Sequence, residues 1–302
     1  MHHLIYITVL FTIYSFPISH AEDWPQYLGP SRNTVWNEKE VELNFDKHPP
    51  KLLWSKPIGG GYSGPSVSDN KVFVMDREAE PYKPKKIKPG TNLNFVKAKI
   101  QGTERVLCLD SRTGEIKWSH SYKSEYSSVF IYAIGPRTTP LVHDGFVFTL
   151  GAEGQLNTYK ADTGKLIWSK NFINDFGIEN PEWGTACHPI IHNNTLICTV
   201  GGSGKTLVAF DYKTGKEEWR NIDSKKSGYG TPVIETINGT KQLIVWNGET
   251  VNGVNPDNGK LYWSVDFKPE YGMAIGAPRV WNDLVFVMGF NGKSGAIKIS
   301  KD

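Results

Sequence analysis

Short apolar runs recur along the chain, each bounded by polar or glycine-containing turns. Five of them have the length of a β-strand and are rich in β-branched and aromatic residues: 71–75, 146–150, 195–199, 242–246 and 283–288. Such runs are typical of buried or half-buried strands. No segment shows a sustained apolar repeat of 3.6 residues. The pattern therefore predicts an all-β chain with almost no helix.

Further strands flank these runs in a fixed order. A shorter apolar stretch that opens with proline precedes each run, beginning at Pro65, Pro140, Pro189, Pro232 and Pro278. Proline is tolerated at the first residue of a strand because no ladder hydrogen bond is lost there. A third strand follows the first three runs, at 105–109, 155–159 and 206–210.

A turn motif and a tryptophan close the unit. Four copies of Asp/Asn/Lys-x-x-Thr/Asn-Gly are each followed by Trp four residues after the Gly, at Trp118, Trp168, Trp219 and Trp263, which are 50, 51 and 44 residues apart. Glycine accepts the positive φ of a tight hairpin, and a fixed offset on a strand puts every Trp on the same side of its sheet. A period of this size indicates four-stranded antiparallel blades, most often of a β-propeller.

The number of blades leaves two alternatives open. Five opening strands are present, but the fifth unit ends at Asp302 before its Gly turn and Trp strand. Upstream, residues 51–54 resemble a Trp strand without a blade of its own. Either Trp54 closes a five-bladed ring, or about five blades form part of a larger ring, and the stop within a hairpin favours the larger ring.

Charge and leader sequence restrict the partners. A net charge of +3 is too small to indicate a nucleic-acid partner. Residues 4–16 are apolar and precede Ser19-His20-Ala21, which is typical of a signal-peptide cleavage site. Thirteen residues are too few to span a bilayer. We therefore expect a signal peptide over 1–21, an extended segment over 22–50, blades over 51–302, and a periplasmic or secreted protein that does not span the membrane.

The three cysteines offer little chemistry. Cys108 and Cys198 lie in apolar strands, as small buried residues do. A Cys187–Cys198 disulfide across one hairpin is possible in an oxidising compartment and stays an open alternative. The sequence contains no Cys-x-x-Cys pair of the kind that binds a metal ion.

The Gly-x-x-x-Trp repeats resemble those of the pyrroloquinoline-quinone-like (PQQ-like) β-propeller family, which includes quinoprotein dehydrogenases and the assembly lipoprotein BamB. The opening Asp23-Trp-Pro-Gln-Tyr-Leu-Gly-Pro-Ser-Arg-Asn33 is similar to the start of a secreted subgroup. The resemblance implies a ring of seven or eight blades. Lys160 departs from the family's usual Asp, and the lipid-attachment Cys of the lipoprotein is missing.

The fold alone specifies no chemistry. The resemblance therefore leaves two functions open. The first, which we favour, is a non-catalytic binding platform in the cell envelope. It has no cofactor and binds an envelope protein or an extended polypeptide. The second is a PQQ- and Ca²⁺-dependent alcohol or sugar dehydrogenase. The adjacent Cys pair that such enzymes place against the cofactor is absent, and we assign no catalytic, cofactor or metal residue.

Candidate binding residues come from position along each blade. Residues just before an opening strand approach the central channel, where propellers often hold ligands. These are Tyr62, Arg137, Trp183, His188 and Tyr229. Aromatic and Arg side chains at one channel mouth suit an anionic or planar group, or a peptide segment. The alternative is that they fill the rim and bind nothing.

Overall fold

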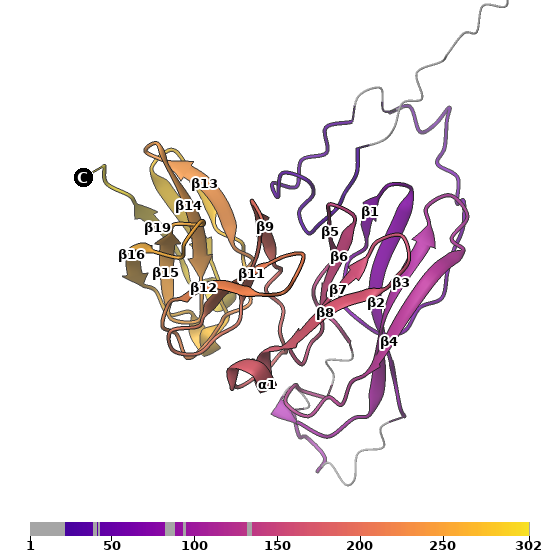
Figure 1. The fold of residues 1–302 in the computed structure, drawn as a ribbon, viewed down its shortest axis with the longest axis horizontal. Helices are drawn as coiled ribbons and strands as arrows, with labels where there is room; N and C mark the ends of the chain where they lie inside the picture. Colours follow the sequence, from indigo (N-terminus) through magenta and orange to yellow (C-terminus); the bar gives the residue numbers. More distant parts are fainter. Residues whose placement is uncertain are drawn as a thin grey trace, which may run out of the picture.

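The computed structural model describes residues 22–38, 41, 43–81, 88–92, 95–131 and 135–301. These residues form five antiparallel sheets that follow one another in chain order, from the β1–β4 sheet to the β17–β19 sheet (Figure 1). The expected signal peptide lies outside the described residues. Among the residues described, no helix is long and apolar enough to cross a membrane.

Each sheet is a meander of consecutive strands, as predicted. The first contains β1 (Ser66–Ser68), β2 (Lys71–Ala79), β3 (Gly102–Asp110) and β4 (Ile116–Lys123). The second contains β5 (Leu141–His143), β6 (Phe146–Leu150), β7 (Gln155–Lys160) and β8 (Leu166–Asn171). The third contains β9 (Ile190–His192), β10 (Thr195–Thr199), β11 (Leu207–Asp211) and β12 (Glu217–Asn221).

The remaining elements complete the same plan. The fourth sheet contains β13 (Val233–Ile237), β14 (Thr240–Trp246), β15 (Thr250–Val254) and β16 (Leu261–Asp266). The fifth contains β17 (Arg279–Trp281), β18 (Leu284–Met288) and β19 (Ser294–Lys298). Helix in the described residues is limited to α1 (Phe172–Phe176) and the 3₁₀ turns η2 (Glu270–Gly272) and η3 (Phe290–Gly292). The expectation of an all-β propeller with almost no helix is confirmed.

The four repeat tryptophans occupy equivalent positions. Each one pairs with the third-strand residue that directly precedes a β-bulge, as in Cys108 opposite Trp118 and Thr158 opposite Trp168. The indole N–H of Trp118 donates to the carbonyl of Ala161 in the next sheet, at 2.8 Å. A Cβ added at Gly164, whose φ is +68°, would lie 2.6 Å from this ring. The glycine is therefore required both for the turn and for the close approach of the neighbouring Trp.

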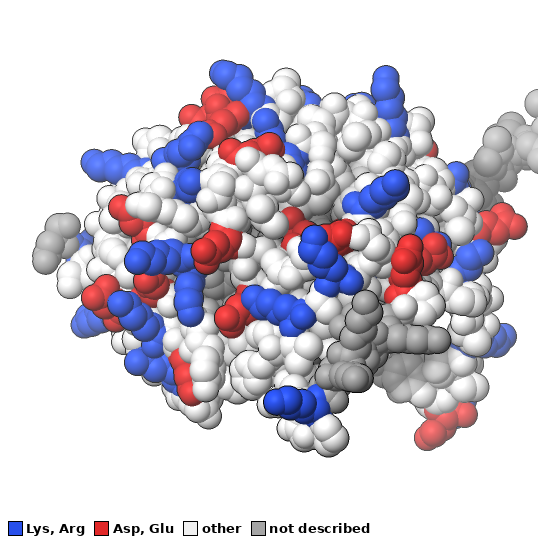
Figure 2. Space-filling model, turned by 90° about the horizontal axis from the view of Figure 1, so that it is seen from below, with Lys and Arg blue, Asp and Glu red and all other residues white. Residues whose placement is uncertain are grey.

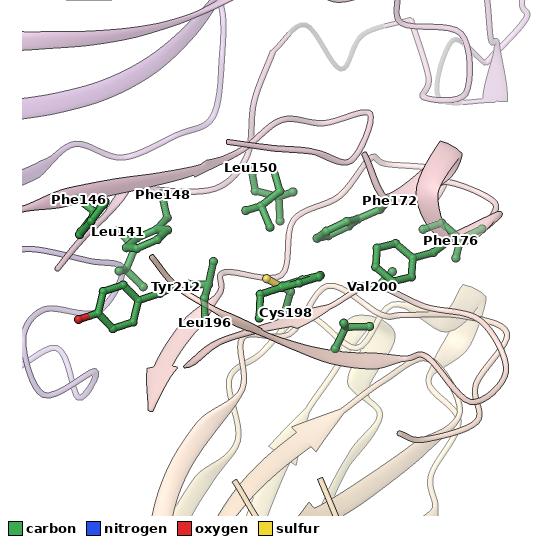
Figure 3. Packing of buried hydrophobic residues seen from close by; sticks show 14 residues of the cluster. Leu141, Phe146, Phe148, Leu150, Phe172, Phe176, Leu196, Cys198, Val200 and Tyr212 are labelled. Atoms are coloured by element: carbon green, nitrogen blue, oxygen red, sulfur yellow. The ribbon is translucent and has the colours of Figure 1, made fainter. Parts of the chain in front are cut away.

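Apolar side chains between consecutive sheets form the core. Figure 3 shows one such cluster, in which Phe146, Phe148 and Leu150 of β6 face Leu196 and Cys198 of β10. Phe172 and Phe176 of α1 extend this cluster at one end. Similar clusters join the first sheet to the second, the third to the fourth and the fourth to the fifth. No cluster of the described residues joins the fifth sheet to the first, so the sheets form an open arc.

The prediction that residues 51–54 form a Trp strand is wrong. They lie in no strand, although Trp54 makes the contacts of a repeat tryptophan. It packs on the turn at Gly114 and donates its indole N–H to Ser111 O at 3.0 Å, as Trp118 packs on Gly164 and donates to Ala161 O. The fifth sheet has three strands, and β19 pairs with β18 alone among the described strands. The structure therefore does not contain a five-bladed ring closed by Trp54. Membership of a larger ring stays a prediction.

The three cysteines form no disulfide with one another. Cys108, Cys187 and Cys198 are free thiols and are all buried. Burial raises the pKa of the Cys108 thiol to about 11 and that of Cys187 to about 12. The thiols therefore stay protonated and act as small apolar residues.

Candidate functional site

One shallow pocket gathers residues from the segments that precede the opening strands of all five sheets. It has a volume of about 270 Å³ and is lined by Tyr62, Arg137, Trp183, Ala186, Tyr229, Met273 and Ile275. We call it the mouth pocket. Five of these residues stand three positions before the opening proline of their blade: Tyr62, Arg137, Ala186, Tyr229 and Ile275. The repeat therefore brings one register position from each blade to one place.

The structure brings together four of the five candidate residues named from the sequence. Tyr62, Arg137, Trp183 and Tyr229 line the mouth pocket. Sequence reasoning missed Ala186, Met273 and Ile275, although the offset from the opening proline identifies Ala186 and Ile275. These apolar side chains carry no chemistry of their own, so residue type alone does not indicate a binding role for them.

Aromatic rings form the wall of the mouth pocket. The rings of Trp183 and Tyr229 meet edge to face, with centroids 5.9 Å apart, and Phe130 packs against the outer side of Trp183 at 5.3 Å. Edge-to-face pairs of this kind hold their rings in place. Tyr62 and Ile275 remain 55% and 49% exposed, so the pocket opens to solvent with an apolar rim.

Arg137 is the one cation among the lining residues of the mouth pocket. It donates to the carbonyl of Gly135, and its guanidinium lies 5.5 Å from the centroid of the Tyr62 ring. No carboxylate among the described residues forms an ion pair with it. A half-buried guanidinium on aromatic rings is suited to accept an anionic group from a ligand.

A second, smaller cavity adjoins the mouth pocket. It has a volume of about 130 Å³ and shares Tyr229 with the mouth pocket. Its lining includes Glu179, Glu182, Lys225 and Lys226. We call it the side cavity.

Figure 2 shows the face of the molecule that carries α1, where basic and acidic side chains are interspersed. The surface there presents no broad field of one sign.

His188 is placed elsewhere. Its ring is buried and stacks on Tyr27 with centroids 3.8 Å apart, and its Nδ1 lies 2.9 Å from Thr231 Oγ1. Burial, together with the nearby charge of Arg32, lowers the pKa of His188 to about 3. His188 is therefore a neutral packing residue under the N-terminal segment and does not line the mouth pocket.

The N-terminal segment 23–34 crosses the opposite end of the inner strands. Its backbone bonds to the first two sheets, through Trp24 paired with Val67 at 2.9 Å and Pro25 O accepting from Val142 N at 2.8 Å. We call this segment the N-terminal strap. In Figure 1 it is the indigo trace beside β1, β5 and β9. It contains the Trp-Pro-Gln stretch on which the family resemblance rests.

Arg32 joins the N-terminal strap to the other sheets. Its guanidinium donates to Gln26 Oε1 at 2.9 Å, to Pro189 O at 3.0 Å and to Pro232 O at 3.3 Å. Arg279 of β17 in turn donates to Arg32 O at 3.1 Å. Burial lowers the pKa of Arg32 to about 10, so it stays charged at neutral pH. The strap thus contacts residues in or just before the opening strands of all five sheets, and it covers the end of these inner strands away from the mouth pocket.

The mouth pocket does not fit a Ca²⁺ site. Ca²⁺ takes six to eight oxygen ligands, largely from carboxylates and carbonyls. No side chain that lines the mouth pocket is a carboxylate. Within the described ranges there is also no group of three or more His, Cys, Asp and Glu side chains that could hold a metal ion.

Comparison with known proteins places the chain among the PQQ-like propellers. Residues 101–302 match the family model described as outer membrane protein assembly factor BamB. A quinoprotein alcohol dehydrogenase from Pseudomonas putida, PedH, is 26% identical over 159 residues, which are 48% of this chain and 24% of that protein. The quinohemoprotein alcohol dehydrogenase ADH IIB from the same species is 28% identical over 142 residues, 43% of this chain and 20% of that protein.

A solved structure gives the same result for the fold. Quinohemoprotein alcohol dehydrogenase ADHIIG from Pseudomonas putida superposes with a TM-score of 0.51 at 16% identity, over 81% of this chain and 41% of that chain. At this identity the likeness concerns the fold. The chain spans between a fifth and a quarter of the length of the curated relatives it matches.

Proposed function

Because the chain belongs to the family described as outer membrane protein assembly factor BamB, we propose that it is an exported, non-catalytic β-propeller that binds polypeptide in the cell envelope through the mouth pocket. The observation that carries the proposal is the convergence of one residue from each of five blades on one apolar pocket. That pocket lies at the end of the channel that the N-terminal strap leaves uncovered.

The chemistry of the pocket supports a binding role. Aromatic side chains held by edge-to-face contacts, with one arginine beside them, are enriched among residues that dominate the energy of protein interfaces. The N-terminal strap supports polypeptide as the ligand, since one of its residues, Trp24, already pairs with the free edge of β1 through two main-chain hydrogen bonds to Val67. Main-chain pairing of this kind is a general mode of peptide recognition.

The alternative is a PQQ-dependent alcohol or sugar dehydrogenase, which the names of the curated relatives suggest. Those relatives extend well beyond the matched region, and the mouth pocket offers no carboxylate for Ca²⁺. The two functions separate in one assay. Purified protein is supplied with PQQ and Ca²⁺, and dye-linked oxidation of alcohols and sugars is measured together with the visible spectrum. Stoichiometric cofactor absorbance with substrate-dependent dye reduction would overturn the binding platform.

Site-specific crosslinking tests the platform directly. A photo-crosslinking amino acid replaces Ile275 at the rim of the mouth pocket and, as a control, Tyr262 on the exposed side of β16. We expect polypeptide adducts at position 275. An excess of unlabelled native protein should suppress these adducts, whereas an excess of unlabelled Ile275→Glu protein should not suppress them. Equal adducts at both positions, or none at position 275, would contradict the proposal.

A further inference from the structure

We propose that the segment bound at the mouth pocket is an extended peptide in which a large apolar side chain stands two residues from a carboxylate, so that both lie on the same face of the peptide. This inference rests on the proposed function and specifies the partner. The apolar side chain enters the mouth pocket, the carboxylate pairs with Arg137, and the chain continues over Tyr229 toward the side cavity.

The volume of the mouth pocket favours a single side chain. Small-molecule sites typically measure about 300–1,000 Å³ and enclose most of their ligand. The mouth pocket, at about 270 Å³, is below that range and has an open rim formed by Tyr62 and Ile275. An aromatic or large aliphatic anchor whose backbone stays outside is the ligand that such a pocket fits.

Arg137 adds the requirement for an anion. Its guanidinium has a carbonyl partner, Gly135 O, but no carboxylate partner among the described residues. The aromatic rings of Tyr62 and Tyr126 lie 5.5 and 5.9 Å from it and reduce its contact with water. A carboxylate on the ligand would therefore form a charge-assisted, bidentate hydrogen bond in a partly desolvated place.

The side cavity adds the requirement for length. It shares Tyr229 with the mouth pocket, so a ligand that occupies both must cross this ring. In an extended peptide, side chains two residues apart lie on the same face, about 6.6 Å apart. A chain anchored in the mouth pocket can thus present a second, polar side chain to the Glu and Lys residues of the side cavity. A compact ligand cannot reach both.

Fluorescence polarisation with synthetic peptides tests the inference. The probe is a fluorescein-labelled nine-residue peptide with Trp-Gly-Glu at its centre and Gly and Ser on both sides, called the Trp-Glu probe. Matched probes carry Trp-Gly-Gln or Ala-Gly-Glu at the centre, called the Trp-Gln and Ala-Glu probes, and a fourth contains the three residues Trp-Gly-Glu only. We expect the Trp-Glu probe to bind about tenfold more tightly than either the Trp-Gln or the Ala-Glu probe, and more tightly than the short probe, because one charge-assisted contact or one buried anchor is worth roughly a factor of ten.

Variants of Arg137 assign the preference to its charge. With Arg137→Gln, the preference for Glu over Gln should vanish while the preference for Trp over Ala remains. With Arg137→Lys, part of the preference for Glu should return. An unchanged preference in Arg137→Gln, or no difference among the four probes, would overturn the inference. Thermal unfolding of each variant checks that the fold is retained.

The outcome separates this inference from the proposed function. Adducts at position 275 without any sequence preference among the probes would leave the platform standing and refute the specificity. Absence of both adducts and peptide binding would refute both. Stoichiometric binding of PQQ that displaces the Trp-Glu probe would assign the mouth pocket to a planar small-molecule anion instead.

Discussion

The two ends of the channel are built from the same repeat but differ in chemistry. At one end the N-terminal strap covers the inner strands, and Arg32 and His188 are buried there. At the other end Tyr62 and Ile275 stand open to solvent around the mouth pocket. The two terminal nitrogens of Arg32 at the covered end donate to Gln26 Oε1 and to two backbone carbonyls, whereas Arg137 at the open end donates to one carbonyl and retains capacity for an external anion.

The difference shows what each end contributes. Buried polar groups stabilise a fold only when their hydrogen bonds are made, and leaving their partners unpaired is costly. The covered end should therefore govern stability. Exposed aromatic side chains contribute little to folding but much to association. The open end should therefore govern binding.

The largest expected effect is at the covered end. Replacing Arg32 with Ala removes three hydrogen bonds and leaves the carbonyls of Pro189 and Pro232 without this donor. We expect the free energy of unfolding to fall by about 3 kcal/mol, measured by urea denaturation at pH 7. The matched control is Arg112→Ala in an exposed turn, which should change it by less than about 0.5 kcal/mol. Equal effects of the two changes would contradict a stabilising role of the strap.

Acid should destabilise the same end through His188. Its pKa is about 3 in the folded chain, while an unfolded histidine titrates near 6.5. The unfolded state binds the proton first, so stability from this residue is complete above about pH 6.5 and is lost as the pH falls toward 3. At about 1.4 kcal/mol per pH unit, the loss between pH 7 and pH 5 is about 2 kcal/mol.

A variant isolates the contribution of His188 to this acid sensitivity. Urea denaturation is compared at pH 7 and pH 5 for the native protein and for His188→Gln. We expect the variant to lose about 2 kcal/mol less over this interval, because glutamine does not titrate. The same pH dependence in both proteins would show that His188 is not held neutral by the fold.

The smallest effect on stability is expected at the open end. Replacing the exposed Tyr62 with Ser should change the free energy of unfolding by less than about 0.5 kcal/mol while it weakens binding of the Trp-Glu probe several-fold. The two measurements are urea denaturation and fluorescence polarisation on the same protein. A large loss of stability with unchanged binding would reverse the comparison between the two ends.

Much of the fold could be predicted because the repeat encodes it locally. Even the second turn, where Lys160 replaces the usual Asp, keeps its hairpin, since the backbone bonds Gly164 N to Lys160 O and Lys160 N to Lys165 O remain. Lys160 itself lies over the Phe146 ring at 3.8 Å. In the third copy the Asp211 side chain additionally accepts from the backbone of Lys213 and Thr214. The turn therefore depends first on the glycine and only second on the acidic residue.

The candidate site was predicted only in part, for a physical reason. Residue type alone favours side chains with chemistry of their own, which in the third blade are Trp183 and His188. The residue at the shared register position of that blade is Ala186, and the fifth blade contributes Ile275. Selecting by offset from the opening proline, instead of by residue type, would have found both.

The amino-acid sequence alone determined the blades of this protein, because turns and strand alternation depend on neighbours along the chain. Only the tertiary structure decided which end of the channel is covered. That outcome depends on hydrogen bonds from Arg32 to carbonyls 157 and 200 residues away, and no local pattern specifies contacts at such separations. It also decided that His188 packs beneath the strap while Arg137 lines the mouth pocket, since burial is a property of the assembled sheets.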